Sequence, residues 1–186
     1  MITPRKLWGG LGNQLFRHAY IYSQARKGLI PDVYVQDFEY FKDVKEEIRK
    51  MYQEGIGERK DRIAIHVRRT DYVNNSFYVD LIKTDYYQKA MAEFQGEKFM
   101  IFSDDIEWCK KQEIFNGIEF SEGKSEVEDM NEMASCKGFI GANSSFSIWS
   151  AFLNINEDKK IIMPKQYYVD GIERTKYPTD EGWVII

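Results

Sequence analysis

Short polar segments follow three of the strands that the sequence predicts, and their side chains could bind an anionic ligand. These segments are 68–71 (RRTD), 103–105 (SDD) and 143–145 (NSS). In an open parallel sheet the carboxyl ends of all strands line one edge, and ligands bind in the crevice there. We therefore expect three segments that are far apart in the sequence to converge on one binding site.

Arg68 and Arg69 are expected to have different roles, because neighbouring residues of a strand point to opposite faces of the sheet. One guanidinium can reach the crevice and hold an anion through its planar fork of donors. The other can pair with Asp71 or with an acid beneath the loop. An arginine pair exposed at the surface is the alternative, but the position directly after a buried strand favours the anion site.

The neighbouring acids Asp104 and Asp105 can accept hydrogen bonds from a purine edge, from ribose hydroxyls or from an arginine. Metal binding is the alternative, because Asp105 and Glu107 form an acid-x-acid pair. Acids at a helix start are common for dipole reasons alone, however. The two histidines and two cysteines of the chain show no paired metal-ligand spacing. We predict no metal site.

The third polar segment precedes a predicted helix at 145–153. Asn143, Ser144, Ser145 and Phe146 therefore stand where unpaired backbone N–H groups and the helix dipole form an anion site. A plain helix cap by Ser144 or Ser145 is the alternative, and the two interpretations are compatible because they use the same donors.

Two weaker signals accompany these segments. His66 lies inside a predicted strand, as a core histidine or as a residue that shapes the phosphate site. The segment 9–14 (GGLGNQ) opens a helix with a glycine spacing that differs from the dinucleotide fingerprint. Its glycines Gly10 and Gly12 allow the backbone to approach a ligand closely, and Asn13 offers an amide donor at the helix start.

Hydrophobic periodicity predicts an α/β fold in which short strands alternate with helices. Strands are expected at 5–8, 33–36, 62–67, 98–102, 118–120, 137–141 and 160–163. Helices are expected from Leu15 to a glycine stop at Gly28 and over 38–53, 85–95, 105–112, 126–135 and 145–153. This alternation is typical of parallel βαβ units in an open sheet. A composition shift near 57–61 predicts a smaller N-terminal lobe, 1–60, and a larger lobe, 61–186.

Composition limits the classes of partner. The formal net charge is −4, which excludes a globally basic surface of the kind that coats nucleic acid. Aromatic residues make up 15% of the chain and suit packing surfaces or the lining of a ligand cleft. No stretch approaches the roughly 18 apolar residues of a membrane span, and no apolar signal segment is present at the N-terminus. We expect a soluble cytoplasmic protein with reduced cysteines.

Four motifs follow one another along the chain: GGLGNQLF at 9–16, HVRRTDY at 66–72, FSDD at 102–105 and ANSSFS at 142–147. They occur in this order in glycosyltransferase family 11, the α-1,2-fucosyltransferases, and the chain resembles that family. The resemblance implies a GT-B-like fold, in which two Rossmann-type lobes face a cleft. It implies transfer of L-fucose from GDP-L-fucose to a galactose-type hydroxyl of a glycan, with inversion and without an essential metal or other cofactor.

The resemblance also implies roles for individual residues. Arg68 would bind the β-phosphate and stabilise the departing GDP, while His66 and Asp71 would order its loop. Asn13 would lie across the cleft near the fucose or the acceptor hydroxyl. Either His18 or Asp71 could serve as general base. The residues expected to bind the donor are Arg68, Arg69, Asp104, Asp105, Asn143, Ser144, Ser145, Phe146, Gly10 and Gly12.

One departure from the family concerns length. Only 51 residues lie between Gln14 and His66, fewer than family members usually have, so the N-terminal lobe is abbreviated. That lobe carries much of the acceptor surface. A nucleotide-sugar-binding module that has lost catalysis is therefore one alternative hypothesis, and transfer of a different sugar or nucleotide hydrolysis are others. Apolar surface left uncovered by a short lobe also suggests a homodimer.

Overall fold

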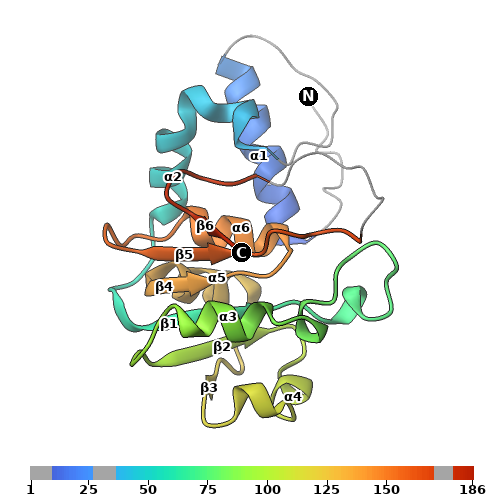
Figure 1. Ribbon diagram of the computed structural model, residues 1–186. Coiled ribbons are helices and arrows are strands. Elements are labelled where there is room, and N and C mark those ends of the chain that lie inside the picture. The colour runs from blue at the N-terminus through green and yellow to red at the C-terminus, as the bar shows by residue number, and fades with distance from the viewer. Residues whose placement is uncertain (1–9, 27–36, 170–177) are drawn as a thin grey trace.

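The computed structural model describes residues 10–26, 37–169 and 178–186. A six-stranded, all-parallel sheet lies at its centre, in the order β3-β2-β1-β4-β5-β6 (Figure 1). The strands are β1 (Lys60–Val67), β2 (Phe99–Ser103), β3 (Glu119–Phe120), β4 (Cys136–Ile140), β5 (Lys160–Met163) and β6 (Val184–Ile185). Strands β1 to β3 follow one another toward one edge of the sheet, and β4 to β6 follow one another toward the other edge. The strand order therefore reverses between β1 and β4, as it does in the Rossmann fold. The predicted α/β class and parallel sheet are confirmed.

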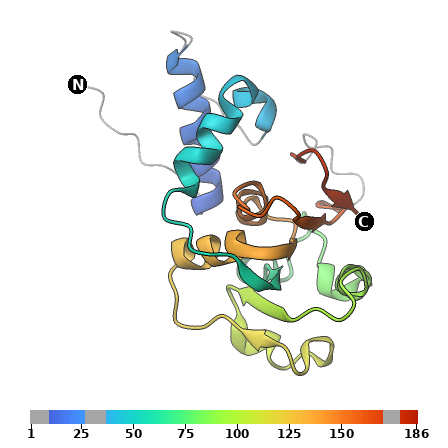
Figure 2. The ribbon, with the colours of Figure 1, turned by 90° about the vertical axis from the view of Figure 1, so that its left-hand side faces the viewer.

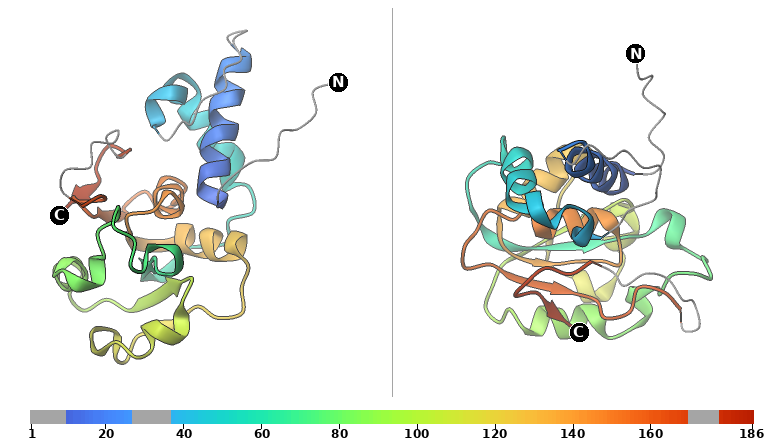
Figure 3. Two further views of the ribbon diagram at one scale, coloured as in Figure 1. Left: turned by 90° about the vertical axis from the view of Figure 1, so that its right-hand side faces the viewer. Right: turned by 90° about the horizontal axis from the view of Figure 1, so that it is seen from above.

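Helices cover both faces of the sheet (Figures 2 and 3). On one face lie α5 (Glu126–Ser135) and α6 (Ser145–Phe152), and on the other lie α3 (Tyr86–Ala92) and α4 (Ile106–Cys109). Outside α6 pack α1 (Leu11–Arg26), the 3₁₀ helix η1 (Phe38–Val44) and α2 (Lys45–Gln53). Three 3₁₀ turns complete the described elements: η2 (Thr70–Tyr72), η3 (Leu81–Lys83) and η4 (Glu113–Phe115).

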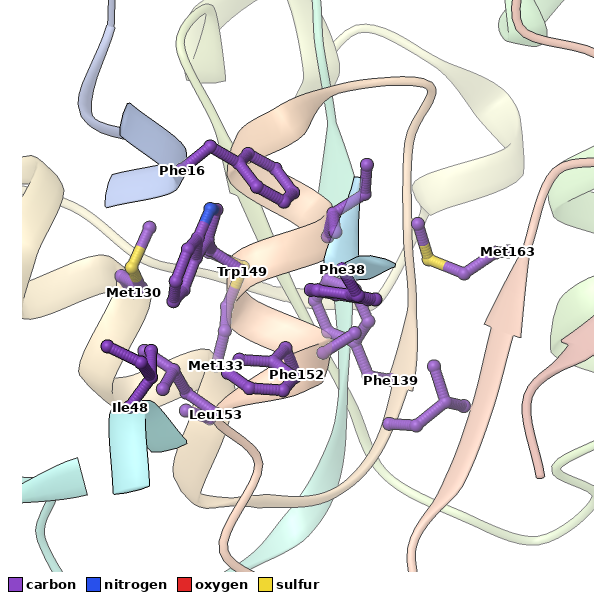
Figure 4. Close-up of a cluster of buried hydrophobic side chains, with 14 of the residues drawn as sticks. Phe16, Phe38, Ile48, Met130, Met133, Phe139, Trp149, Phe152, Leu153 and Met163 are labelled. Carbon is purple, nitrogen blue, oxygen red and sulfur yellow. The ribbon is translucent and has the colours of Figure 1, made fainter. Parts of the chain in front are cut away.

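Aromatic side chains join the N-terminal helices to the sheet through one core (Figure 4). The Phe16 ring of α1 lies 5.1 Å from that of Trp149 in α6, and Phe38 of η1 stacks on Phe152 at 4.8 Å, measured between ring centroids. The residues predicted to form an N-terminal lobe therefore cover α6 directly. The division of the chain into 1–60 and 61–186 stays a prediction.

Alternation along β1 decides which way its last residues point. Ile63, Ile65 and Val67 belong to the core under α3 and α4, whereas Ala64 belongs to the core under α5 and α6. Because successive strand side chains alternate between faces, residues 66 and 68 are directed toward α6 and residue 69 toward α4.

Some predicted elements differ from the structure. The helix predicted over 38–53 is broken at Phe41, whose φ of −137° and ψ of 26° are non-helical. Its first part is a 3₁₀ helix because Phe38, Phe41 and Val44, three residues apart, are all buried, and a 3₁₀ turn aligns residues at that spacing. The helix predicted over 105–112 ends at Cys109. Strands predicted at 5–8 and 33–36, and the stop at Gly28, lie outside the described residues.

Asp180 ties the C-terminal segment to α2. Its carboxylate pairs with Lys45, and its Oδ2 lies 2.6 Å from Nη2 of Arg49. The Asp180 side chain is only 10% exposed, so both pairs are shielded from water. Arg49 also stacks on the Phe152 ring, with Cζ 4.5 Å from the centroid, and thereby links this carboxylate to the core.

Asp180→Asn is expected to lower the free energy of unfolding by about 2 kcal/mol, because it leaves two partly buried cations without their shared carboxylate. Urea denaturation measures the loss. Asp158→Asn is the matched control, since Asp158 pairs with Arg59 at the surface and its side chain is 67% exposed. We expect no measurable change for the control, and an equal loss in both variants would contradict the role given to Asp180.

Candidate functional site

The strand order reverses between β1 and β4, where ligands bind in open α/β sheets, and we call the region at the carboxyl ends of these two strands the crevice. Ile65 of β1 pairs with Ile140 of β4, so the segments that leave these two strands start side by side. Tyr72, after β1, donates a 2.9 Å hydrogen bond to the carbonyl of Asn143, after β4. The structure thus brings together the polar segments at 68–71 and 143–145. The third segment, at 103–105, begins at the end of the neighbouring strand β2.

Asp104, at the end of β2, organises the loop that follows β1. Its Oδ1 accepts the backbone N–H of Arg69 at 2.8 Å, and its Oδ2 accepts the hydroxyl of Thr70 and lies 3.0 Å from Nη1 of Arg68. Both carboxylate oxygens are therefore engaged by the arginine loop. The sequence prediction that Asp104 faces a base or ribose stays a prediction, and the observed role is to hold this loop.

Arg68 lies in the crevice, held by two acids. Nη2 donates to Oδ1 of Asp71 at 2.5 Å, opposite the contact with Asp104. The guanidinium carbon lies 5.6 Å from the centroid of the Tyr72 ring, which in turn contacts the carbonyl of Asn143. The side chain is 29% exposed. The guanidinium is therefore fixed in direction, is linked through the Tyr72 ring to the turn before α6 and still presents surface to a ligand.

Arg69 points the other way, as strand alternation predicts. Its guanidinium carbon lies 3.5 Å from the centroid of the Trp108 ring, and Nη1 lies 3.5 Å from Oδ1 of Asp80. With 9% of its side chain exposed, Arg69 is an internal cation beneath the loop. The structure places it away from the crevice, on the α4 side of the sheet.

His66 is buried and connects β1 to α6. Its Nδ1 lies 2.6 Å from the hydroxyl oxygen of Ser147, and that oxygen also accepts the backbone N–H of Ala142 at 2.8 Å. The Ser147 proton therefore points to Nδ1, which leaves the ring proton on Nε2. Burial, and secondly the charge of Arg68, lower the pKa of His66 to about 3. His66 is consequently a neutral structural ring beside the arginine, not a proton carrier at neutral pH.

The N-terminus of α6 is capped and aimed into the crevice. Ser144 is the N-cap residue, and its hydroxyl accepts the N–H of Phe146 at 3.3 Å. The amide of Asn143 donates to the carbonyls of Val79 and Tyr167, so this side chain shapes the turn. The predicted cap is confirmed, and the positive end of the α6 dipole lies at the carboxyl edge of the sheet.

The N-terminus of α1 meets the N-terminus of α6. Ser145 donates its hydroxyl hydrogen to Oδ1 of Asn13 at 2.8 Å. A Cβ placed on Gly12 would lie 2.6 Å from the carbonyl carbon of Ser145, so only glycine permits this approach. Gly12 thus brings two helix N-termini together, while Gly10 is exposed, with no atom within 4 Å of an ideal Cβ. Two positive dipole ends and Arg68 adjoin the same crevice.

The remaining predicted residues have other contacts. The carboxylate of Asp105 caps α4 by accepting the N–H of Trp108 at 3.2 Å, which is the helix-start role of an acid. His18 contacts the hydroxyl of Tyr52 on α2. Within the described ranges, no group of three or more histidine, cysteine or acidic side chains is arranged to hold a metal ion.

A cavity at the neighbouring strands β2 and β3 contains a residue that the sequence analysis did not single out. This cavity of about 260 Å³ lies at the carboxyl ends of β2 and β3, lined by Ser103, Ile106, Glu107, Ser121, Glu122, Gly123, Lys124 and Asp129. Asp129, on α5, accepts the Ser121 hydroxyl through Oδ1 at 2.7 Å. Burial raises the pKa of this carboxyl. The sequence signal for Asp129 was its place in the predicted helix at 126–135, next to the apolar residue Met130.

Together these features define a class of protein. A Rossmann strand order, with an arginine loop and a helix N-terminus at the reversal point, is a lobe of the kind found in GT-B glycosyltransferases. The sequence profile of Glycosyl transferase family 11 matches residues 9–186, and the chain belongs to this family.

Two curated relatives from Escherichia coli are similar to this chain. It is 34% identical to the O-antigen biosynthesis glycosyltransferase WbnK over 145 residues, covering 72% of this chain and 47% of WbnK. It is 33% identical to an alpha-1,2-colitosyltransferase over 180 residues, covering 81% of this chain and 60% of that enzyme. The chain thus spans about half the length of the curated relatives that it matches. None of the helices in the described ranges has the length and apolarity that a bilayer-spanning segment needs.

Proposed function

We propose that the chain transfers L-fucose from GDP-L-fucose to a galactose-type hydroxyl of a glycan, with inversion and without a metal ion, and that residues 61–186 bind the donor. The observation that carries this proposal is Arg68, which Asp71 and Asp104 hold at the carboxyl end of β1, in a loop that Tyr72 links to the turn before α6. Family membership and the similarity to two sugar transferases support the reaction class. The proposal places the reaction in the cytoplasm, and the homodimer stays a prediction.

Charge development explains why these groups suit the reaction. As the bond between the sugar and the diphosphate breaks, negative charge grows on the β-phosphate. A fixed guanidinium and the amides at the start of α6 stabilise that charge without having to reorganise. Because Asp71 and Asp104 already hold Arg68, little conformational entropy is lost when the phosphate binds. The acceptor oxygen attacks from the opposite side of the sugar, which inverts the anomeric carbon.

The nucleobase would occupy the cavity that contains Asp129. Passing from β4 to β3 crosses three strand spacings, about 14 Å in total, which suits an extended nucleoside diphosphate. Guanine presents the N1–H and N2–H donors side by side, and one carboxylate can accept both, whereas adenine has no such donor pair. Asp129 keeps the acceptor capacity for both donors, since the Ser121 hydroxyl occupies one acceptor position of Oδ1 and each carboxylate oxygen has two. The cavity therefore favours a guanine nucleotide.

Titration calorimetry with GDP, UDP and ADP tests the donor, and incubation with GDP-L-fucose and a lactose-type acceptor tests the transfer. We expect GDP to bind most tightly and a fucosylated product to form. Equal affinity for the three nucleotides would remove the donor assignment. Tight GDP binding without transfer to any acceptor would instead support a binding module that has lost catalysis, the second candidate, which the short spacing of 51 residues between Gln14 and His66 favours.

Asp129→Asn is expected to weaken GDP binding about tenfold, because the carboxamide loses the charge and half of the acceptor capacity facing guanine. The same variant should gain affinity for xanthosine diphosphate, whose base has a carbonyl where guanine has its amino group. Calorimetry with both nucleotides measures the exchange. Glu122→Gln is the control, since this acid lines the same cavity with its side chain 56% exposed. An unchanged ratio of GDP to xanthosine diphosphate affinity in Asp129→Asn would contradict the base assignment.

A further inference from the structure

Arg69 is an internal cation for which the proposed reaction provides no role. The residue is 7% exposed, and its Nε is buried with no hydrogen-bond partner among the described residues. Its acidic neighbour Asp80 lies 3.5 Å from Nη1, a long contact, and also pairs with Lys83 at 3.2 Å. Such weak ionic compensation is unusual for a buried arginine, because desolvating a charge is costly unless it is well paired.

Trp108 supplies the compensation that hydrogen bonds do not. The Arg69 guanidinium lies over the indole, with Cζ 3.5 Å from the ring centroid, close enough for a strong cation–π contact in a desolvated setting. The helix position that carries the indole is fixed, because the backbone N–H of Trp108 donates to the carboxylate of Asp105, the N-cap of α4. The indole thus extends from a capped helix start to the Arg69 guanidinium.

The backbone of Arg69 is also the point from which the arginine loop is built. Its N–H donates to Asp104, and its carbonyl accepts the N–H groups of Tyr72 at 2.7 Å and Val73 at 3.2 Å. A side chain held by Trp108 therefore fixes the backbone that carries Arg68 on the opposite side. Asp104 and Trp108 are four residues apart along the chain. Asp104 holds the backbone of the loop at Arg69, and Trp108 holds the Arg69 side chain.

We propose that Trp108 is a positioning residue: its indole holds the Arg69 guanidinium, and this stack keeps the loop at 68–73 in the arrangement that aims Arg68 into the crevice. The consequence for nucleotide binding rests on the proposed function. The effect on the loop itself does not, and the two can be measured separately.

Hydrogen exchange of the peptide that spans 66–75 measures the loop directly. Trp108→Leu removes the aromatic face and should increase exchange at least tenfold in this peptide, because the amides of residues 69, 72 and 73 lose their fixed acceptors. Trp108→Phe keeps a ring and should largely restore protection. Trp183→Leu is the matched control, since Trp183 packs on Phe38, in the other core cluster. Unchanged exchange in Trp108→Leu would overturn the proposal.

A double-mutant cycle with GDP separates positioning from general destabilisation. Trp108→Leu should weaken GDP binding about fivefold in the otherwise unchanged protein. It should have no further effect in the Arg68→Ala background, because Trp108 acts on GDP through the position of the Arg68 side chain. An equal loss in both backgrounds would overturn the proposal. If the unchanged protein binds no GDP, the proposed function fails, and the exchange experiment still decides the role of Trp108. Arg69→Lys, which cannot lie flat on the indole, provides the second variant if Trp108→Leu does not fold.

Discussion

Arg68→Ala is expected to weaken GDP binding about 30-fold, which corresponds to about 2 kcal/mol for a lost charge-assisted contact. The rate of sugar transfer should fall further, by roughly 100-fold or more, because the negative charge on the leaving phosphate is greatest in the transition state. The two acids that pair with Arg68 increase the loss of GDP affinity. Without the guanidinium, Asp71 and Asp104 remain next to the phosphate with no cation between them and the bound anion.

Arg68→Lys distinguishes charge from geometry at the same position. Lysine keeps the positive charge but not the planar fork that spans Asp71, Asp104 and a phosphate at once, so we expect an intermediate loss of both affinity and rate. Arg59→Ala is the control, because Arg59 pairs with Asp158 at the surface and its side chain is 49% exposed. Calorimetry with GDP and initial transfer rates provide the measurements. GDP affinity in Arg68→Ala equal to that of the control would exclude the crevice as the phosphate site.

The central strands and their helices could be predicted because their signals are local. Strand β2 lies one residue from its predicted position, and α5 has its predicted bounds, since a capping box between Ser125 and Glu128 fixes where it begins. The two-residue strand β6 was not predicted, because two residues are too few to show the alternation of a strand, and both Val184 and Ile185 are exposed. Its pairing with β5 depends on the chain returning to the sheet edge, which local sequence does not encode.

At the site, the convergence of segments could be predicted and the partners of individual side chains could not. Parallel topology alone places the loop that carries Arg68 next to the turn at Asn143, and Tyr72 of that loop bonds to the turn. Whether Asp104 binds a ligand or the arginine loop depends on contacts across 35 residues of sequence. Asp129 looks like one more surface acid of an acidic helix, and only the fold reveals that it enters a cavity.

Gly12→Ala is expected to lower the free energy of unfolding by about 3 kcal/mol, at the upper end of the cost of overpacking a tight contact. The added methyl group would lie 2.6 Å from the carbonyl carbon of Ser145 and 2.7 Å from the backbone nitrogen of Phe146. Both atoms belong to the backbone at the start of α6, so no side-chain rotation can relieve the overlap. The gain in helix propensity from glycine to alanine, about 1 kcal/mol, is too small to offset it.

Gly12→Ala also tests whether the start of α6 takes part in anion binding, because residue 12 lies where the N-termini of α1 and α6 meet. Moving α1 away from α6 would also break the hydrogen bond between Ser145 and Asn13. Urea denaturation measures the stability, and GDP titration of the folded protein shows whether the start of α6 has shifted. Gly57→Ala is the matched control, since no atom lies within 4 Å of its ideal Cβ and its backbone is not left-handed. A Gly12→Ala protein as stable as this control would show that α1 does not pack on α6 through residue 12.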